Sequence, residues 1–162
     1  MNTPSMREFF EMVRQWSDGD DNNRACLELA VTERFGSRQA IMFTDMSGFS
    51  KTTAERGILA FLSFIERAVR LGKPIIEAQG GRLVKTIGDD LCCLFPTAEA
   101  AVKAAIEMKQ AYAEDSETRA ENDRFEMAFG IGFGDVLDID GEDMFGDEVN
   151  RASKLGEDIA ES

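Results

Sequence analysis

Residues 125–134 read FEMAFGIGFG, and this stretch decides the fold class. Large apolar side chains alternate along it with Glu, Ala or Gly, and this period of two predicts a β-strand. Glycines occupy every second position from Gly130 to Gly134. Glycine inside a strand marks a place where another segment approaches the backbone closely. We therefore predict a strand whose glycines permit such an approach.

Two further strand patterns lie upstream. Residues 83–87 and 91–95 are apolar and flank the sequence GDD at 88–90, which predicts a β-hairpin with an acidic tip. Residues 38–45, RQAIMFTD, form another apolar run that ends in a carboxylate. Together with the strand over 125–134, these patterns predict at least four strands.

Helical periodicity separates these strands. Apolar residues at three- and four-residue spacing predict helices that start near Thr53, at Thr97 and at Val149. Gly72 and Pro74 are expected to kink or end the first of these helices. The alternation of strands and helices around a central hairpin predicts an α+β fold, a ferredoxin-like sandwich.

The segments that connect these elements are polar. Residues 114–124 predict a loop, and residues 138–143, DIDGED, predict a turn. At the start of the chain, an apolar stripe over 6–16 and a second pattern over 24–35 predict two short helices. Two short helices cannot bury a core alone, so residues 1–37 are expected to be a helical lead-in to one domain over 38–162.

The charge of the chain restricts its partners. Lys and Arg number 18 against 31 Asp and Glu, which gives a formal net charge of -13. Such a chain repels phosphodiester backbones and anionic lipid, so we expect neither nucleic acid nor a membrane as a partner. With three cysteines, two of them adjacent, and no long apolar run, we expect no disulfide framework and a cytoplasmic location.

The chain contains no histidine. This excludes Ser-His-Asp and Cys-His catalysis and HExxH zinc sites. A metal would have to be held mainly by oxygen ligands, which points to Mg²⁺, Mn²⁺ or Ca²⁺.

Asp45 and Asp89 are the candidate ligands. Either residue alone is most simply a turn residue. If the strand over 38–45 pairs beside the hairpin, both carboxylates project from one edge of the sheet and repel each other unless a divalent cation lies between them. Lys85 lies two residues from both Leu83 and Ile87, so in a regular strand it is expected on the same face as these two residues. It is either a snorkelling lysine or a donor to a nucleobase or phosphate.

Four short motifs occur in a characteristic order: FTDMSGF at 43–49, GGRLVKTIGDD at 80–90, GIGFGDV at 130–136 and DMFGDEVNRASKL at 143–155. On these motifs, residues 38–162 resemble the catalytic domain of class III nucleotidyl cyclases, the adenylate and guanylate cyclases. The resemblance implies an antiparallel-rich sheet with helices packed on it. In this family the last helix is followed by further strand structure with a basic phosphate-binding residue, so the domain ending at Ser162 is expected to be incomplete at its C-terminal side.

The resemblance assigns a role to individual residues. It implies metal ligands at Asp45, Asp89 and the Met46 carbonyl. A loop that binds the triphosphate follows, formed by Ser47, Gly48, Phe49 and Ser50. Lys85 and Asp143 match the positions that read the base, and this pair favours ATP over GTP because Lys donates to adenine N1 and Asp accepts from its amino group.

Two further positions match the last helix of the family. Asn150 matches the asparagine that positions the ribose. Lys154 stands where the family has an arginine that stabilises the transition state, and a lysine offers no planar fork to phosphate oxygens. Arg151 is a candidate substitute, about 100° round the helix from Asn150.

The implied activity is an adenylate cyclase that converts ATP to 3',5'-cyclic AMP and pyrophosphate. Two Mg²⁺ or Mn²⁺ ions per active site and a homodimer are implied, with the two aspartates Asp45 and Asp89 from one subunit facing the other site residues of the second. The alternative, favoured by Lys154 and the early C-terminus, is a catalytically silent cyclase-like module that dimerises or binds nucleotide for regulation.

Overall fold

The protein is described by a computed structural model that covers residues 6–47 and 56–160, with the backbone alone at 157–160. Its centre is a five-stranded sheet in which every neighbouring pair is antiparallel, in the order β2-β3-β1-β4-β5. The strands are β1 (Gly36–Met46), β2 (Arg82–Ile87), β3 (Asp90–Phe95), β4 (Met127–Ile139) and β5 (Asp143–Phe145). The pairing on which the interpretation of Asp45 and Asp89 depends is present, since β1 pairs with β3 of the hairpin.

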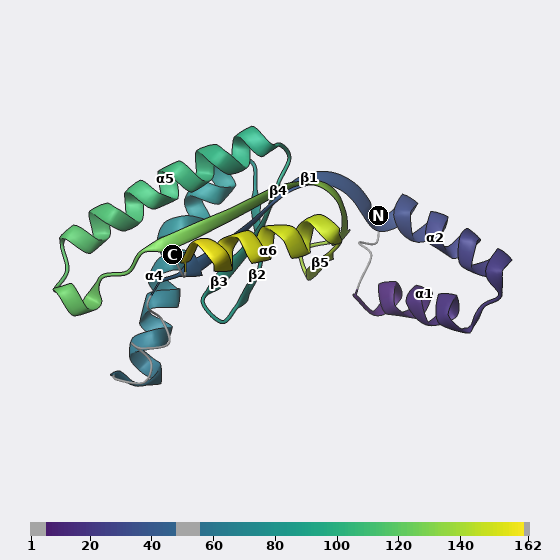
Figure 1. The fold of residues 1–162 in the computed structure, drawn as a ribbon, viewed down its shortest axis with the longest axis horizontal. Helices are drawn as coiled ribbons and strands as arrows, with labels where there is room; N and C mark the ends of the chain where they lie inside the picture. The colour runs from purple at the N-terminus through teal and green to yellow at the C-terminus, as the bar shows by residue number, and fades with distance from the viewer. Residues whose placement is uncertain (1–5, 48–55, 161–162) are drawn as a thin grey trace.

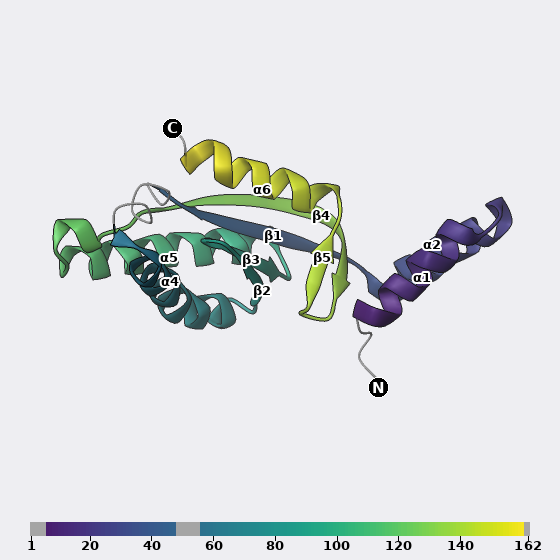
Figure 2. The ribbon, with the colours of Figure 1, turned by 90° about the horizontal axis from the view of Figure 1, so that it is seen from below.

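Helices cover both faces of this sheet (Figure 1). They are α1 (Met6–Asp18), α2 (Asp21–Phe35), α4 (Ile58–Ala78), α5 (Ala98–Glu117), the short 3-10 helix η1 (Glu121–Asp123) and α6 (Asp147–Ala160). Figure 2 shows α4 and α5 on one face of the sheet and α6 on the other. The α+β sandwich predicted from the sequence is confirmed.

Each face has its own core. Side chains of β1, β3, α4 and α5 pack together on the face covered by α4 and α5, and this core includes Phe64, Phe95, Met108, Tyr112 and Phe125. The core on the α6 face is made of smaller groups from β1, β3, β4 and β5, and it reaches Val149 and Ala152 of the helix.

The glycines of β4 set the distance between that strand and α6. A Cβ at Gly130 would lie 2.2 Å from the Ala152 carbonyl oxygen and 2.5 Å from the Gly156 nitrogen. A Cβ at Gly134 would lie 2.5 Å from the Glu148 side chain. The close backbone approach predicted for these glycines is therefore confirmed, and the neighbouring segment is α6.

The helix α4 continues through Gly72 and Pro74 to Ala78, so neither residue ends it. Gly72 is buried against α5, where a Cβ would lie 2.5 Å from the Tyr112 hydroxyl. Pro74 and Arg70, whose carbonyl would have accepted the missing hydrogen bond, are both exposed. Water can satisfy that carbonyl, which explains why the helix tolerates the proline. The predicted start near Thr53 lies outside the described residues.

Other boundaries also differ from the predictions. Helix α5 runs to Glu117 and η1 follows, so much of the predicted loop over 114–124 is helical. Strand β4 extends to Ile139, and the predicted turn narrows to the residues between β4 and β5, where Asp140 and Gly141 have positive φ. At the N-terminus, the Asp20 side chain accepts a hydrogen bond from the Asn23 nitrogen and starts α2 earlier than its apolar pattern indicates.

The two N-terminal helices lie side by side beyond one end of the sheet (Figures 1 and 2). Phe9 of α1 and Phe35 at the end of α2 are buried together with Ile139 of β4, and Phe9 stacks on Phe145 with ring centroids 5.3 Å apart. Among the described helices, none is both long enough and apolar enough to cross a membrane.

Candidate functional site

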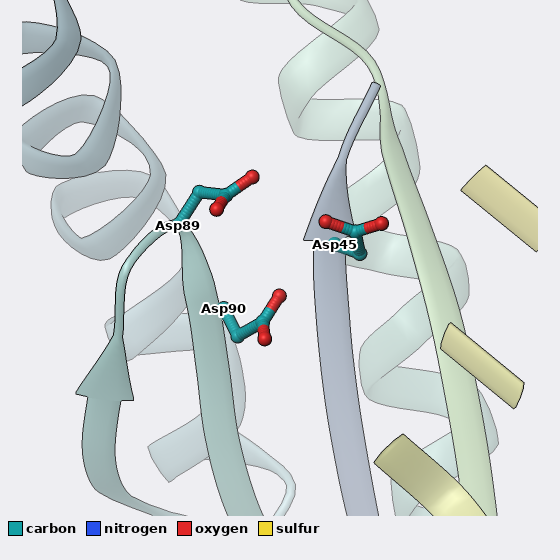
Figure 3. Close-up of side chains that lie close together, drawn as sticks. All are labelled: Asp45, Asp89 and Asp90. Carbon is teal, nitrogen blue, oxygen red and sulfur yellow. The ribbon is translucent and has the colours of Figure 1, made fainter. Parts of the chain in front are cut away.

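Three carboxylates meet at one end of the sheet. Asp45 comes from the end of β1, Asp89 from the turn between β2 and β3, and Asp90 from the start of β3. One carboxylate oxygen from each lies within 4.8 Å of the others, and all three residues are half-buried. Figure 3 shows the three carboxylates directed into the space between the two strands.

Strand register produces this cluster. Phe43 is paired with Cys92, and continuing the antiparallel register by two residues places Asp45 opposite Asp90. The Leu91 nitrogen donates to the buried Thr44 hydroxyl at 3.0 Å, and the Met46 nitrogen donates to Asp89 Oδ2 at 3.3 Å. These two bonds join the end of β1 to the hairpin at the position of the acids.

The cluster fits a hard divalent cation. Carboxylate oxygens are the preferred ligands of Mg²⁺, Mn²⁺ and Ca²⁺, and three within 4.8 Å repel one another when no cation neutralises them. The sequence identified Asp45 and Asp89 as candidate ligands. It assigned no ligand role to Asp90, although its place directly after Asp89 at the hairpin tip was the available sign.

Lys85 and Asp143 form the second group. The Lys85 ammonium donates to Asp143 Oδ1, which also accepts from the Met144 nitrogen at 2.7 Å. The two side chains come from β2 and β5, which stand at opposite ends of the strand order. The structure thus brings together the two residues that the sequence predicts to read a base.

The prediction that Lys85 lies on the same face of the strand as Leu83 is wrong. A bulge interrupts β2, so that Leu83 pairs with Cys93 and Lys85 pairs with Cys92. Cys93 belongs to the core under α4 and α5, and Cys92 to the core on the α6 face. Since the bulge adds one residue to the strand, Lys85 lies on the face opposite Leu83.

The buried Cys92 thiol lies between the two groups. Burial is the main cause that raises the pKa of Cys92 to about 12; the charges of Asp90 and Asp143 add to the rise, and the Lys85 charge opposes it. A thiol with this pKa is protonated at neutral pH and is a poor nucleophile. Its role here is packing, and by strand register Asp90 and Lys85 lie on the same side of the sheet as this thiol.

The two predicted catalytic residues lie on α6. Asn150 and Lys154 are exposed and stand one helical turn apart, on the side away from the buried Val149 and Ala152. The hydrogen bonds and ion pairs of the described residues join neither of them to the acidic cluster or to Lys85 and Asp143. Arg151 forms an ion pair with Glu148 along the same helix.

The predicted triphosphate loop is described only at its start. Met46 is the last residue of β1, and the exposed Ser47 follows, its nitrogen donating to the Glu126 carbonyl at 3.1 Å. Gly48, Phe49 and Ser50 lie outside the described residues.

Comparison with known sequences identifies one family. A family model described as adenylate and guanylate cyclase catalytic domain matches residues 32–160. An adenylate cyclase of Streptomyces coelicolor is 33% identical over 152 residues, which are 94% of this chain and 38% of that protein. A putative adenylate cyclase 3 of Rhizobium meliloti is 27% identical over 116 residues. The chain thus spans 38% and 20% of the lengths of these two relatives.

Solved structures give the same result. The crystal structure of an adenylate/guanylate cyclase/hydrolase from Silicibacter pomeroyi is 36% identical, with a TM-score of 0.67, covering 75% of this chain and 70% of that one. A bacterial light-regulated adenylyl cyclase has a TM-score of 0.69 at 21% identity, covering 75% of this chain and 40% of that one, and shares the fold.

Proposed function

The chain belongs to the adenylate and guanylate cyclase catalytic domain family, and from this premise we propose that it converts ATP to 3',5'-cyclic AMP and pyrophosphate. The observation that carries the proposal is the meeting of Asp45, Asp89 and Asp90 at one end of the sheet. The relatives named adenylate cyclase in Streptomyces coelicolor and Rhizobium meliloti support the adenylate specificity.

The acidic cluster would hold two Mg²⁺ or Mn²⁺ ions. Such ions, when bound, lower the pKa of the ribose 3'-hydroxyl and neutralise triphosphate charge. Asp45 and Asp89 provide carboxylate ligands and Met46 provides its carbonyl. The Met46 amide fixes the Asp89 carboxylate through its hydrogen bond, so that the ligand needs little rearrangement on binding.

Base selection falls to the second group. The Lys85 ammonium would donate to adenine N1, and the Asp143 carboxylate would accept from the 6-amino group. In the structure these two groups satisfy each other, so an entering base exchanges one ion pair for two hydrogen bonds. Guanine offers the reverse pattern at these positions, a donor at N1 and an acceptor at O6, and is rejected.

The remaining roles fall to α6 and to the loop after β1. Asn150 would orient the ribose and Lys154 would stabilise charge as the 3'-oxygen attacks the α-phosphorus and pyrophosphate leaves. Ser47 to Ser50 would bind the triphosphate through backbone N–H groups. Because no hydrogen bond or ion pair among the described residues joins Asn150 or Lys154 to Lys85, Asp143 or Asp89, we propose that the complete site forms between two copies, as a homodimer.

A second candidate function is favoured by Lys154. Where the family has arginine, this lysine gives up the planar, bidentate contact with phosphate oxygens. A catalytically silent module that binds nucleotide or dimerises for regulation would retain the rest of the site. Lys154→Arg should raise turnover if the lysine limits catalysis.

An assay with purified protein tests the proposal. ATP or GTP is supplied with Mn²⁺ or Mg²⁺ and the cyclic product is quantified; we expect cyclic AMP in excess over cyclic GMP. Lys85→Glu should depress ATP use, since an unpaired polar group in a base pocket costs about 1 to 3 kcal/mol. Lys103→Glu, an exposed change on α5, is the matched control. ATP binding without cyclic product, by the Lys154→Arg variant as well, would favour the silent module.

A further inference from the structure

The bulge in β2 places two cations on the same face of the sheet. Arg82 pairs with Leu94 and Lys85 pairs with Cys92, and both partners belong to the core on the α6 face. In a regular strand two residues three positions apart face opposite sides. Because the bulge adds one residue between Leu83 and Lys85, Arg82 and Lys85 point the same way.

These cations form two ion pairs with the β4–β5 hairpin. Arg82 binds Asp138 on β4, and Lys85 binds Asp143 on β5. Asp138 pairs in register with Met144, the residue after Asp143, so the two anions are close neighbours on the hairpin. The pairs thus run in parallel from β2 to the hairpin.

The Asp138 carboxylate depends on Arg82 for most of its pairing. Asp138 Oδ2 accepts from Arg82 and, at 3.1 Å, from the Gln39 amide, while Asp138 Oδ1 is buried with no hydrogen-bond partner among the described residues. Without Arg82, this carboxylate would keep a single amide donor while its charge remained largely out of water. Such a group is expected to move toward solvent and to take the hairpin with it.

The strand that carries Asp143 is short, and its packing comes from Met144 in the core on the α6 face and from Phe145 against Phe9. It is three residues long and is joined to β4 by three register pairs, from Leu137↔Phe145 to Ile139↔Asp143. The turn before it contains Asp140 and Gly141 with positive φ. A Cβ at Gly141 would lie 3.2 Å from Arg82 Nη1, so the guanidinium also lies against this turn.

We propose that Arg82, acting through Asp138, is a positioning residue for base selection: it holds the β4–β5 hairpin against β2 and thereby keeps Asp143 within reach of Lys85. The positioning is a property of this chain's own contacts, and its consequence for base selection rests on the proposed function. Arg82 touches no substrate in this scheme.

Competitive amine labelling tests the positioning without any nucleotide. The protein is treated with a trace of acetic anhydride, and mass spectrometry gives the reaction rate of the Lys85 amine relative to that of Lys103, an exposed residue of α5. Arg82→Gln should raise the Lys85 rate several-fold, to the level seen in Asp143→Asn, and Arg82→Lys should restore part of the protection. Arg70→Gln, which removes an exposed pair with Glu66, is the matched control. An unchanged Lys85 rate in Arg82→Gln overturns the proposal.

Nucleotide selectivity gives the second readout. Arg82→Gln should reduce the ratio of kcat/KM for ATP to kcat/KM for GTP by about tenfold, as expected for one weakened hydrogen bond. A purely structural defect would lower both values equally, and an unchanged ratio together with unchanged labelling counts against Arg82. If labelling changes as expected but neither nucleotide is converted, the positioning is upheld and the proposed activity fails.

Discussion

The two faces of the sheet differ in what fills them. Under α4 and α5 the side chains are large and apolar, and the buried charges there are matched, since Asp115 accepts from both Arg67 and Arg119. Under α6 the strand carries glycines and the helix approaches its backbone. By strand register, Asp45, Asp90 and Lys85 lie on this second side. The face under α4 and α5 thus holds the large apolar core, and the face under α6 holds most of the residues that we propose to bind metal and base.

Arg67→Met should have the largest effect on stability. The Arg67 guanidinium is buried, donates to Asp115 and, at 2.8 Å, to the Asp123 carbonyl, and lies 5.0 Å from the centre of the Phe125 ring. Its removal leaves the Asp115 charge incompletely paired, which costs about 3 kcal/mol. Urea unfolding measures the loss, and Arg70→Met, at an exposed pair, should change the free energy of unfolding by less than about 1 kcal/mol. Equal losses in the two variants would show that burying the Arg67–Asp115 pair adds no stability to this face.

Asp115 adds an acid dependence to the same face. Burial alone raises the pKa of Asp115, but the hydrogen bonds and charges of Arg67 and Arg119 outweigh it and lower the pKa below the ordinary value of 3.8. A carboxylate with a lowered folded-state pKa stabilises the fold above its unfolded pKa, and this contribution is lost as the pH falls through the folded value. The stability difference between wild type and Asp115→Asn should therefore be constant above pH 3.8 and shrink below it. A difference that stays constant into strong acid would contradict the assignment.

Gly130→Ala sharpens the comparison on the opposite face. The added methyl would meet backbone atoms of α6, which cannot rotate away, so α6 must shift at a cost of about 2 kcal/mol. Gly132→Ala is the matched control, because its nearest neighbours lie at 3.2 Å and one of them belongs to the flexible Glu148 side chain. Thermal unfolding of both variants checks the order. If Gly132→Ala lowered the stability more than Gly130→Ala, the closest approach of β4 to α6 would not be at Gly130.

The sequence predicted the elements that depend on periodicity. Alternation at 125–134 and the hairpin over 83–95 correspond to β4 and to β2 with β3. The sequence could not predict the bulge in β2, because residues 83–87, LVKTI, are equally compatible with a regular strand. Only the pairing with β3 reveals the added residue. For the same reason the side of the sheet reached by Lys85 depends on tertiary structure. The continuation of α4 past Pro74 likewise depends on which side of the helix meets water.

The candidate site was predictable to a similar extent. Asp45 and Asp89 were placed at one edge by the assumption that their strands pair, and β1 does pair with β3. Asp90 joins them because the register sets it opposite Asp45, which no local pattern specifies. The ion pair between Lys85 and Asp143 joins β2 and β5, the two edge strands of the sheet. Local sequence patterns cannot predict a contact between strands that are not neighbours in the sheet.

Metal binding gives the smallest of these effects and separates chemistry from stability on the α6 side. A cation at ten times its Kd should add about 1.4 kcal/mol to the free energy of unfolding by mass action on the native state. In Asp45→Asn combined with Asp89→Asn this increment should vanish, while stability without metal should not fall, because neutral amides relieve the repulsion among three neighbouring acids. Titration of Mn²⁺ or Mg²⁺ during thermal unfolding measures both quantities. The control combines Glu99→Gln with Glu107→Gln, two exposed residues of α5, and removes the same formal charge. This variant should retain the stabilisation by the cation. If the cation still stabilises the aspartate variant, it binds elsewhere. If that variant is much less stable than wild type without metal, the acidic cluster stabilises the fold, and the two faces of the sheet do not differ in this respect.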